Sequence, residues 1–389
     1  MNKQRVINAS IDCINNFKIS KYPIKNIAQE IIRSRKLNSQ ERAVFLDLVF
    51  LWARESYLVN KFLEKNIKFY NGLSNQQKDI LAINILVDQD NNYKNYLKIL
   101  GDDRYLIALG EVFREELIKS HGAKAQEIAK GIWEKPTKYL AFDSLVYTRE
   151  NIIKELADNN IIAHPHALAP HALRVENNIK LDNLPKKLQE NLWFMDAGSQ
   201  IIASCVKSKI GERVLDLCVG EGNKARLIAM SQCSLVALDI NSRRLEHAKK
   251  RLKDFSVEYI CADGANSGLE PESFDWILID APCSGSGVLR RNPDLIYRLS
   301  KEQLINYQTL QHNLLVSAIK LLKPGGKIIY ATCSLFSSEN QQQIDNILKA
   351  NTNLLSCELD YLNKSSFELI PHIYDCDGFY IAGLMKMRD

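Results

Sequence analysis

Residues 214–225 read VLDLCVGEGNKA, in which a short apolar run leads into a turn of small residues. Small residues after a strand let a ligand approach the backbone where the next helix begins. Gly220, Gly222 and Ala225 loosely match the fingerprint of dinucleotide-binding folds. Asp239 ends the next apolar run, where a carboxylate can accept hydrogen bonds from ribose hydroxyls. The stretch therefore predicts an α/β nucleotide-binding fold, and it suits a nicotinamide cofactor and S-adenosylmethionine equally well.

Short apolar runs and helix candidates alternate through the rest of the C-terminal half. The runs are residues 235–239, 276–280 and 327–330, and the helix candidates are residues 242–253 and 301–322. This alternation is typical of a parallel sheet with βαβ crossovers. We therefore predict a Rossmann-like α/β domain over residues 196–389.

The N-terminal third is predicted to be helical, because apolar residues recur at helical spacing in residues 43–52 and 58–63. Residues 1–134 are accordingly expected to form an all-α domain. Prolines then punctuate short segments in residues 135–195, which indicates a small α+β connector. The predicted fold class is thus multidomain: all-α, then α+β, then α/β.

Charge is distributed unevenly along the chain. The 389 residues carry a formal net charge of +5. Residues 1–130 hold 21 Lys and Arg against 15 Asp and Glu, whereas the remaining residues hold 30 against 31. A basic N-terminal part suggests a polyanionic partner such as a nucleic acid. The alternative is that solvated helix faces are often rich in lysine.

Composition argues against several classes of protein. No apolar run approaches the roughly 18 residues that a membrane span needs, and the first residues lack the apolar block of a secretory signal. The nine cysteines are an odd number and include no Cys-x-x-Cys pair. This pattern fits reduced thiols and argues against a structural zinc site. We therefore expect a cytoplasmic protein with no membrane partner and no metal.

Two cysteines stand in similar motifs at predicted strand ends. Residues 280–287 read DAPCSGSG, and residues 330–334 read YATCS. Cys283 and Cys333 would each lie just past the carboxyl end of a parallel strand, where open α/β sheets bind ligands. Hydride transfer has no obvious use for such a pair, so the motifs argue against a nicotinamide-dependent enzyme.

Methylation of carbon-5 of a cytosine does need such thiols. A thiolate that adds to carbon-6 turns the ring into an enamine, and carbon-5 can then take a methyl group. A carboxylic acid at Asp280 would stabilise the charge that develops near ring N3, and a second thiol could assist release of the adduct. Because the thiolate is the reactive form, one cysteine should have a lowered pKa.

Arg290 and Arg291 follow the first cysteine motif. Paired arginines beside a catalytic loop are candidates for binding RNA phosphates. The alternative is a surface loop without function.

The motifs, taken in order, resemble those of the NOL/NOP/Sun RNA cytosine-5 methyltransferases. The resemblance is closest to the RsmB-type bacterial enzymes that act on 16S ribosomal RNA, and it covers nearly the whole chain. In particular, the helical region around Glu41 and Leu58 resembles their NusB-like RNA-binding domain. The resemblance implies an enzyme that uses S-adenosylmethionine and has small-subunit ribosomal RNA as its partner. We expect the protein to be a monomer.

The resemblance also implies roles for individual residues. Cys333 would be the nucleophile, and Cys283 would aid product release. Asp239 would bind the ribose, Asp263 would lie near the adenine, and Asp280 would touch both the cofactor and the target base. The methionine part of the cofactor would be held by Cys218, Val219, Gly220, Glu221, Gly222, Asn223 and Lys224.

This cofactor loop departs from the family pattern Cys-Ala-x-Pro-Gly-Gly-Lys-Thr. Glu221 replaces the proline, Asn223 the second glycine and Ala225 the threonine. A negative charge at Glu221 should weaken cofactor binding unless the side chain points away. The altered loop therefore leaves open an RNA-binding assembly factor with weakened catalysis. Separately, the same chemistry on transfer RNA stays open, although the NusB-like part argues against it.

Overall fold

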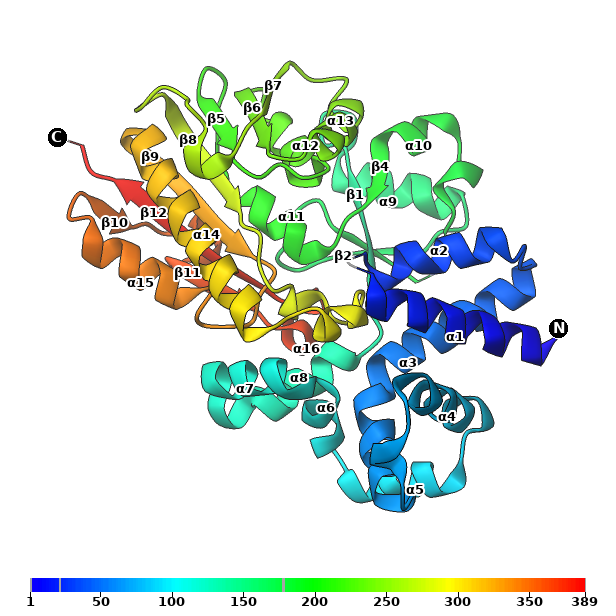
Figure 1. The fold of residues 1–389 in the computed structure, drawn as a ribbon. Helices are drawn as coiled ribbons and strands as arrows, with labels where there is room; N and C mark the ends of the chain where they lie inside the picture. The colour runs from blue at the N-terminus through cyan, green and yellow to red at the C-terminus, as the bar shows by residue number, and fades with distance from the viewer. Residues whose placement is uncertain (1, 21, 177–178, 389) are drawn as a thin grey trace. The chain divides into compact units, whose positions relative to one another are not determined.

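The structure is a computed structural model and describes residues 2–20, 22–176 and 179–388. Its internal contacts divide the chain into two units. The first unit comprises the residues up to Glu134 together with Leu289–Ser300. The second comprises Lys135–Val288 and the residues from Lys301 onward (Figure 1).

The first unit is helical (Figure 1). Its helices are α1 (Lys3–Ile19), α2 (Ile24–Ser34), α3 (Ser39–Asn66), α4 (Asn75–Asp88), α5 (Asn91–Leu100), α6 (Asp103–Ala108), α7 (Gly110–His121) and α8 (Ala125–Trp133). The long helix α3 begins at a capping box, in which the Asn38 side chain accepts from the Glu41 N–H and the Glu41 side chain accepts from the Asn38 N–H. Buried apolar side chains from α1 to α6 form one core, against which Trp133 of α8 also packs.

The segment Leu289–Ser300 is part of this helical unit, although it follows the first cysteine motif in the sequence. It contains the 3₁₀ helix η6 (Pro293–Tyr297). The Tyr297 ring stacks on Trp52 and on Tyr57, with centroids 5.2 and 5.4 Å apart. The sequence analysis predicted domain boundaries at residues 134 and 195 and did not predict that residues 289–300 belong to the helical unit.

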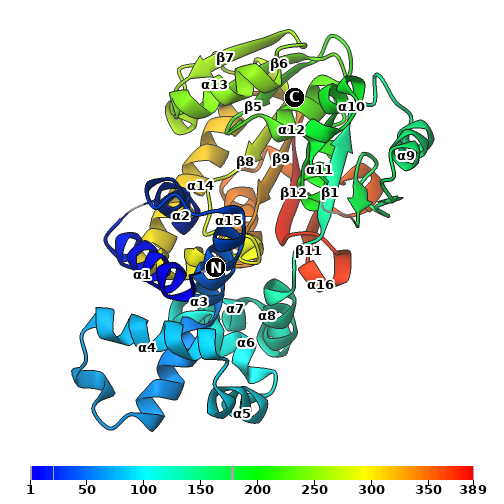
Figure 2. The same cartoon turned by 90° about the vertical axis from the view of Figure 1, so that its right-hand side faces the viewer.

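The second unit begins with a small antiparallel sheet in the order β2-β3-β1-β4. Its elements are β1 (Lys138–Phe142), α9 (Arg149–Asp158), β2 (Ala163–Pro165), β3 (Leu173–Val175), α10 (Lys186–Asn191) and β4 (Leu192–Phe194). Tyr139, Ala141 and Trp193 share one apolar core with α11 (Ala197–Ser204), and Figure 2 shows β1 beside that helix. The connector is therefore packed onto the α/β part rather than being a loose link.

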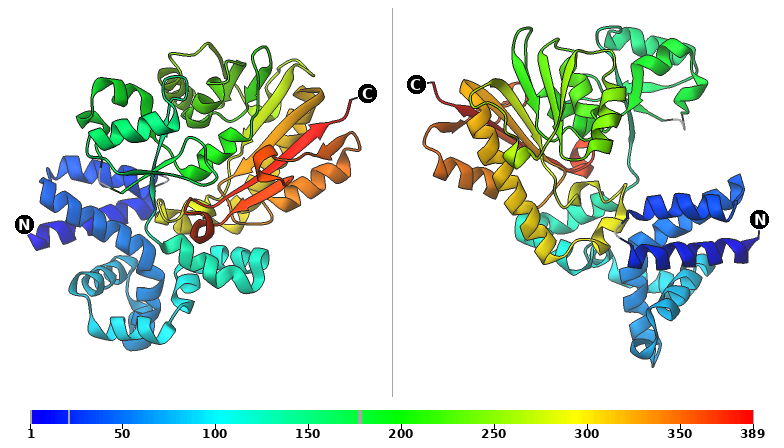
Figure 3. Two further views of the ribbon diagram at one scale, coloured as in Figure 1. Left: turned by 180° about the vertical axis from the view of Figure 1, so that it is seen from behind. Right: turned by 45° about the horizontal axis from the view of Figure 1, so that its top comes forward.

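The large sheet has the order β10-β12-β9-β8-β5-β6-β7, with β11 paired to β12. Its strands are β5 (Arg213–Asp216), β6 (Ser234–Asp239), β7 (Val257–Cys261), β8 (Phe274–Asp280), β9 (Leu322–Thr332), β10 (Leu354–Ser356), β11 (Ser366–Leu369) and β12 (Phe379–Lys386). Five neighbouring strands of this sheet, β9, β8, β5, β6 and β7, run parallel to one another, and β12 is antiparallel to β9. Figure 3 shows β12, in red, toward the end of the sheet that is opposite β7.

Helices cover both faces of the large sheet, as the prediction of a Rossmann-like fold required. One face packs on α11, α12 (Asn223–Ala229) and α13 (Ser242–Arg251), and the other on α14 (Lys301–Leu321) and α15 (Gln341–Ala350). Leu215, Val236, Ile277 and Ile328 are each at most 1% exposed, because these strands are buried on both faces. Because β5, β6, β8 and β9 run parallel, their carboxyl ends lie along one edge of the sheet.

Within the described residues, no helix is long and apolar enough to cross a bilayer. The same residues contain no cluster of three or more His, Cys, Asp or Glu side chains suited to a metal ion.

Candidate active site

The turn after β5 is shaped by two glycines with positive φ. Gly220 has φ +55° and Gly222 has φ +82°, values that side-chain-bearing residues rarely adopt. A Cβ on Gly222 would also lie 3.1 Å from the Cα of Ala248, so α12 and α13 could not keep their present approach. The Gly220 N–H donates to the Asp239 carboxylate at 2.9 Å, which fixes the loop against the end of β6.

A cavity of about 400 Å³ lies at the carboxyl ends of the strands. This volume falls in the range of roughly 300–1,000 Å³ that is usual for small-molecule sites. Among the residues predicted from sequence, the cavity is lined by Cys218, Gly220, Asp239, Asp263, Asp280, Cys283 and Cys333. Sequence reasoning missed Arg244 and Tyr307, which also line it, because neither lies in a motif.

The rest of the predicted cofactor loop does not line the cavity. Val219 is buried in the apolar core, and Gly222 and Asn223 lie at the beginning of α12. The Glu221 carboxylate lies 3.6 Å from His247 Nδ1 and 3.7 Å from Arg251 Nη2, both on α13. The charge of Glu221 is therefore directed toward α13, which removes the main reason to expect weak cofactor binding.

Lys224 contributes through Asp280, a residue that lines the cavity. Its ammonium lies 2.6 Å from Asp280 Oδ2 at the end of β8. Burial opposes the charged form of Lys224, but Asp280 and Cys333 outweigh it and the pKa of Lys224 is raised. A positive charge is thus held next to both the Asp280 carboxylate and the Cys333 sulfur.

The two cysteines of the sequence motifs lie side by side. Strands β8 and β9 are adjacent and parallel, with Asp280 opposite Ala331, so the loops that follow them meet. Cys283 Sγ and Cys333 Sγ are 3.3 Å apart. The hydrogen bond to Cys333 and then burial raise the pKa of Cys283, which keeps that thiol protonated. Cys283 can therefore donate to the Cys333 sulfur.

A buried Glu339 joins the two cysteine loops. Its carboxylate accepts from the Ser284 N–H at 2.9 Å, from the hydroxyls of Ser284 and Ser334 at 2.5 Å each, and from Gln311 Nε2 at 3.0 Å. Glu339 is fully buried, and burial raises its pKa although these hydrogen bonds lower it. Gln311 Nε2 also donates to the Pro282 carbonyl at 2.9 Å. Glu339 thus fixes both loops at once.

Asn340 holds the Cys333 loop from both sides. Its Nδ2 donates to the Ser334 carbonyl at 2.9 Å, and its Oδ1 accepts from the Thr332 hydroxyl at 2.5 Å. Sequence analysis missed Glu339 and Asn340, since a polar pair in a loop gives no local sign of being buried.

Asp216, at the end of β5, is a further acidic group that the sequence analysis did not single out. It is 1% exposed, and its Oδ1 has no hydrogen-bond partner among the described residues. Burial and then the nearby Asp280 raise the pKa of Asp216 to about 7.

Arg290 and Arg291 are in the segment Leu289–Ser300, which belongs to the helical unit, whereas the cavity residues belong to the second unit. Arg290 is 3% exposed, and its carbonyl accepts from Arg54 Nη2 at 3.5 Å. Burial weighs against direct contact between the Arg290 guanidinium and RNA phosphates, and the predicted role stays a prediction.

The Rossmann-like sheet and the cavity at its strand ends, with two thiols beside it, define a methyltransferase. The profile of the 16S rRNA methyltransferase RsmB/F family matches residues 203–385. Ribosomal RNA small subunit methyltransferase B of Serratia proteamaculans is 30% identical over 74% of this chain and 68% of its own length. The protein of that name from Yersinia enterocolitica is 32% identical over 67% of this chain and 62% of its own length. The chain belongs to this RsmB/F family, which confirms the resemblance predicted from its motifs.

Solved structures support the fold. The crystal structure of PH0851 matches with a TM-score of 0.77 at 19% identity and covers 99% of both chains. A methyltransferase homologue from Pyrococcus horikoshii matches with a TM-score of 0.64 at 24% identity, covering 73% of this chain and 98% of its own. NSun6 from the same organism, solved with SFG, gives 0.59 at 19% identity over 71% of this chain and 98% of its own.

Proposed function

We propose that this protein transfers a methyl group from S-adenosylmethionine to carbon-5 of a cytosine in 16S ribosomal RNA. The observation that carries the proposal is the 3.3 Å separation of the Cys283 and Cys333 sulfurs at the edge of a cofactor-sized cavity that Asp280 also lines. The names of the curated relatives support small-subunit ribosomal RNA as the substrate class.

The cavity suits S-adenosylmethionine, which supplies the methyl group when bound. Asp239 at the end of β6 is placed to accept hydrogen bonds from ribose hydroxyls, and Asp263 lies along the same wall. The Gly220 backbone lines the cavity without a side chain, which leaves room for the ligand. NSun6, a fold relative, was solved with SFG, an analogue of S-adenosylmethionine, which agrees with this assignment.

The protein side chains then act on the cytosine. The Cys333 sulfur adds to carbon-6, and the Lys224 ammonium stabilises the thiolate that this addition requires. The Lys224–Asp280 ion pair supplies a proton to ring N3, where negative charge develops, so that carbon-5 becomes nucleophilic and takes the methyl group. Carbon-5 then gives up its proton to water, the carbon-5–carbon-6 double bond re-forms and the carbon–sulfur bond breaks, while the Cys283 thiol donates a hydrogen bond to the departing sulfur.

The target base must leave its stack to reach the cysteines, so single-stranded or unpaired RNA is the expected substrate. We also propose that the protein is monomeric and cytoplasmic. The assembly-factor alternative was motivated by Glu221, whose carboxylate is directed toward α13. The transfer RNA alternative has no supporting feature in the site.

The test is transfer of radiolabelled methyl from S-adenosylmethionine to protein-free 16S ribosomal RNA, followed by nucleoside analysis. We expect the label in 5-methylcytidine. Label in another nucleoside would contradict the cysteine chemistry. Label in transfer RNA but not in 16S ribosomal RNA would leave the chemistry in place and overturn the substrate.

A further inference from the structure

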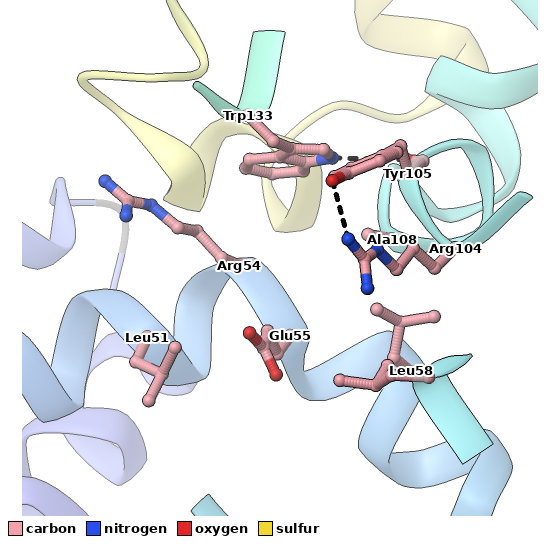
Figure 4. A pocket seen from close by; sticks show the side chains of 9 residues that line it. Leu51, Arg54, Glu55, Leu58, Arg104, Tyr105, Ala108 and Trp133 are labelled. Atoms are coloured by element: carbon pink, nitrogen blue, oxygen red, sulfur yellow. Dashed lines mark hydrogen bonds between the residues drawn. The ribbon is translucent and has the colours of Figure 1, made fainter. Parts of the chain in front are cut away.

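A second cavity, of about 320 Å³, lies in the helical unit among α3, α5, α6 and α8 (Figure 4). Its sides carry the indole of Trp133 and the phenol of Tyr105, and its base is apolar with Leu51 and Leu58. Trp133 Nε1 donates to the Tyr105 carbonyl at 3.1 Å, which holds the half-buried indole in place. The cavity therefore offers a preformed aromatic wall to a planar ligand.

Charged groups surround the same space. Figure 4 shows Glu55 near the guanidinium group of Arg104, which donates to the Tyr105 hydroxyl at 2.8 Å, whereas the Arg54 guanidinium points away from these side chains. The Nε of Arg54 is buried and has no hydrogen-bond partner among the described residues. Glu55 accepts from the Tyr93 hydroxyl at 2.9 Å through one oxygen, which leaves the other able to accept from a ligand. Arg104 and Glu55 thus place a cation and an acceptor beside one aromatic cavity.

A basic groove continues from this cavity. The groove is lined by Asn91, Lys94, Asn95 and Lys98 of α5, and it shares Leu97 and Arg104 with the cavity. The four α5 residues follow helical spacing, so they form one face of the helix. That face carries two cations and two amides, and the lining of the groove includes no carboxylate. It is therefore suited to a chain of phosphates.

We propose that the cavity and the groove together bind single-stranded RNA, with one unstacked base against Trp133 and the adjoining phosphates along α5. Glu55 would repel a phosphate in the cavity, whereas it can accept from the exocyclic amine of a base. Stacking on an aromatic side chain with flanking cations is how single strands are commonly bound. An acidic peptide would use the lysines but gain little from the indole. This inference deepens the proposed function and rests on RNA being the substrate.

The test uses the full-length protein, a fluorescent single-stranded RNA of mixed sequence and the same strand with abasic sites. Lys94→Gln/Lys98→Gln should weaken RNA binding about tenfold and lower the salt dependence of binding, because two phosphate contacts are lost. Lys25→Gln/Lys61→Gln removes the same charge from exposed positions outside the groove and should leave affinity unchanged. Trp133→Leu should lower the affinity for the normal strand roughly tenfold and the affinity for the abasic strand only slightly. Trp133→Phe should restore the affinity for the normal strand.

Equal affinity of all these variants for RNA, with normal thermal unfolding, would overturn the proposal. Loss with the lysine pair but not with Trp133→Leu would also overturn it, because an anionic peptide or a non-specific polyanion would then fit better. Failure of the proposed function is distinguishable. In that case the wild-type protein would methylate no RNA, whereas failure of this inference alone leaves methylation intact in the Lys94→Gln/Lys98→Gln variant.

Discussion

At the residue scale, the site depends on some side chains that can be predicted from sequence motifs and on others that cannot. Cys283 and Cys333 could be predicted because their motifs place chemistry at strand ends. Glu339 could not be, since its importance comes from contacts with Ser284, which lies far from it in the sequence. A buried carboxylate with four donors is typical of a residue that positions others.

Glu339→Ala should lower kcat by roughly 100-fold while changing the KM for S-adenosylmethionine only slightly, because the two cysteine loops would shift relative to each other. Glu339→Gln keeps an acceptor and the side-chain volume and should retain most of the activity. Glu302→Ala, at an exposed position of α14, is the control. Steady-state methyl transfer measures both constants. Wild-type kcat in folded Glu339→Ala would show that the loops keep their positions without it.

Asp216 should make stability dependent on pH. Its pKa of about 7 lies above the ordinary value of 3.8, so the folded state favours the protonated carboxyl. The stability that this provides is fully present below about pH 4 and is lost as the pH rises through 7. At about 1.4 kcal/mol per pKa unit, the loss is a few kcal/mol.

Denaturant unfolding between pH 4 and 8 tests this. Asp216→Asn is neutral at every pH and should flatten the decline, whereas the exposed Asp158→Asn on α9 should reproduce the wild-type curve. A wild-type slope in Asp216→Asn would mean that another group titrates.

At the scale of elements, periodicity located most of the α/β part. The apolar runs at residues 235–239 and 276–280 make up most of β6 and β8, and the helix predicted at residues 242–253 is α13 at Ser242–Arg251. These predictions succeed because buried parallel strands and amphipathic helices are set by local pattern. The direction of Glu221 could not be predicted, because it depends on how α13 packs beside the cofactor loop.

Gly222→Ala tests the packing of the cofactor loop. A Cβ here meets Ala248 at 3.1 Å in addition to the strain of φ +82°. We expect a loss of stability of about 2 kcal/mol or more and weaker S-adenosylmethionine binding by calorimetry. Gly268→Ala is a matched control, since Gly268 has φ +69° but open space around its Cβ position. The Gly268→Ala variant should lose about 1 kcal/mol of stability and bind the cofactor normally. Equal binding by both variants would argue that the loop tolerates the side chain.

At the scale of the whole molecule, the chain returns to the helical unit after the first cysteine motif. The segment Leu289–Ser300 belongs to that unit, so the unit is built from two separate stretches of sequence. Local composition could not reveal this, because the partners of Tyr297 are Trp52 and Tyr57 on α3. The all-α character of the first 134 residues, by contrast, was evident from periodicity alone.

Tyr297→Ala should destabilise the helical unit by about 3 kcal/mol, because a large buried ring is removed. Tyr297→Phe keeps the stacking and loses only the hydroxyl, which donates to the Ala53 carbonyl at 3.1 Å, so it should cost about 1 kcal/mol. Thermal unfolding of the full chain, followed by circular dichroism, provides the comparison. Equal melting of Tyr297→Ala and wild type would mean that the segment adds no stability.

The central claim is that Cys333 attacks the base and Cys283 allows the product to leave. The measurement is the amount of RNA that stays attached to the protein after denaturing electrophoresis, with S-adenosylmethionine and 16S ribosomal RNA present. Cys283→Ala should accumulate a covalent band, whereas Cys333→Ala and the double variant should form none and should not turn over. A covalent band in Cys333→Ala, or normal turnover by it, would contradict the account.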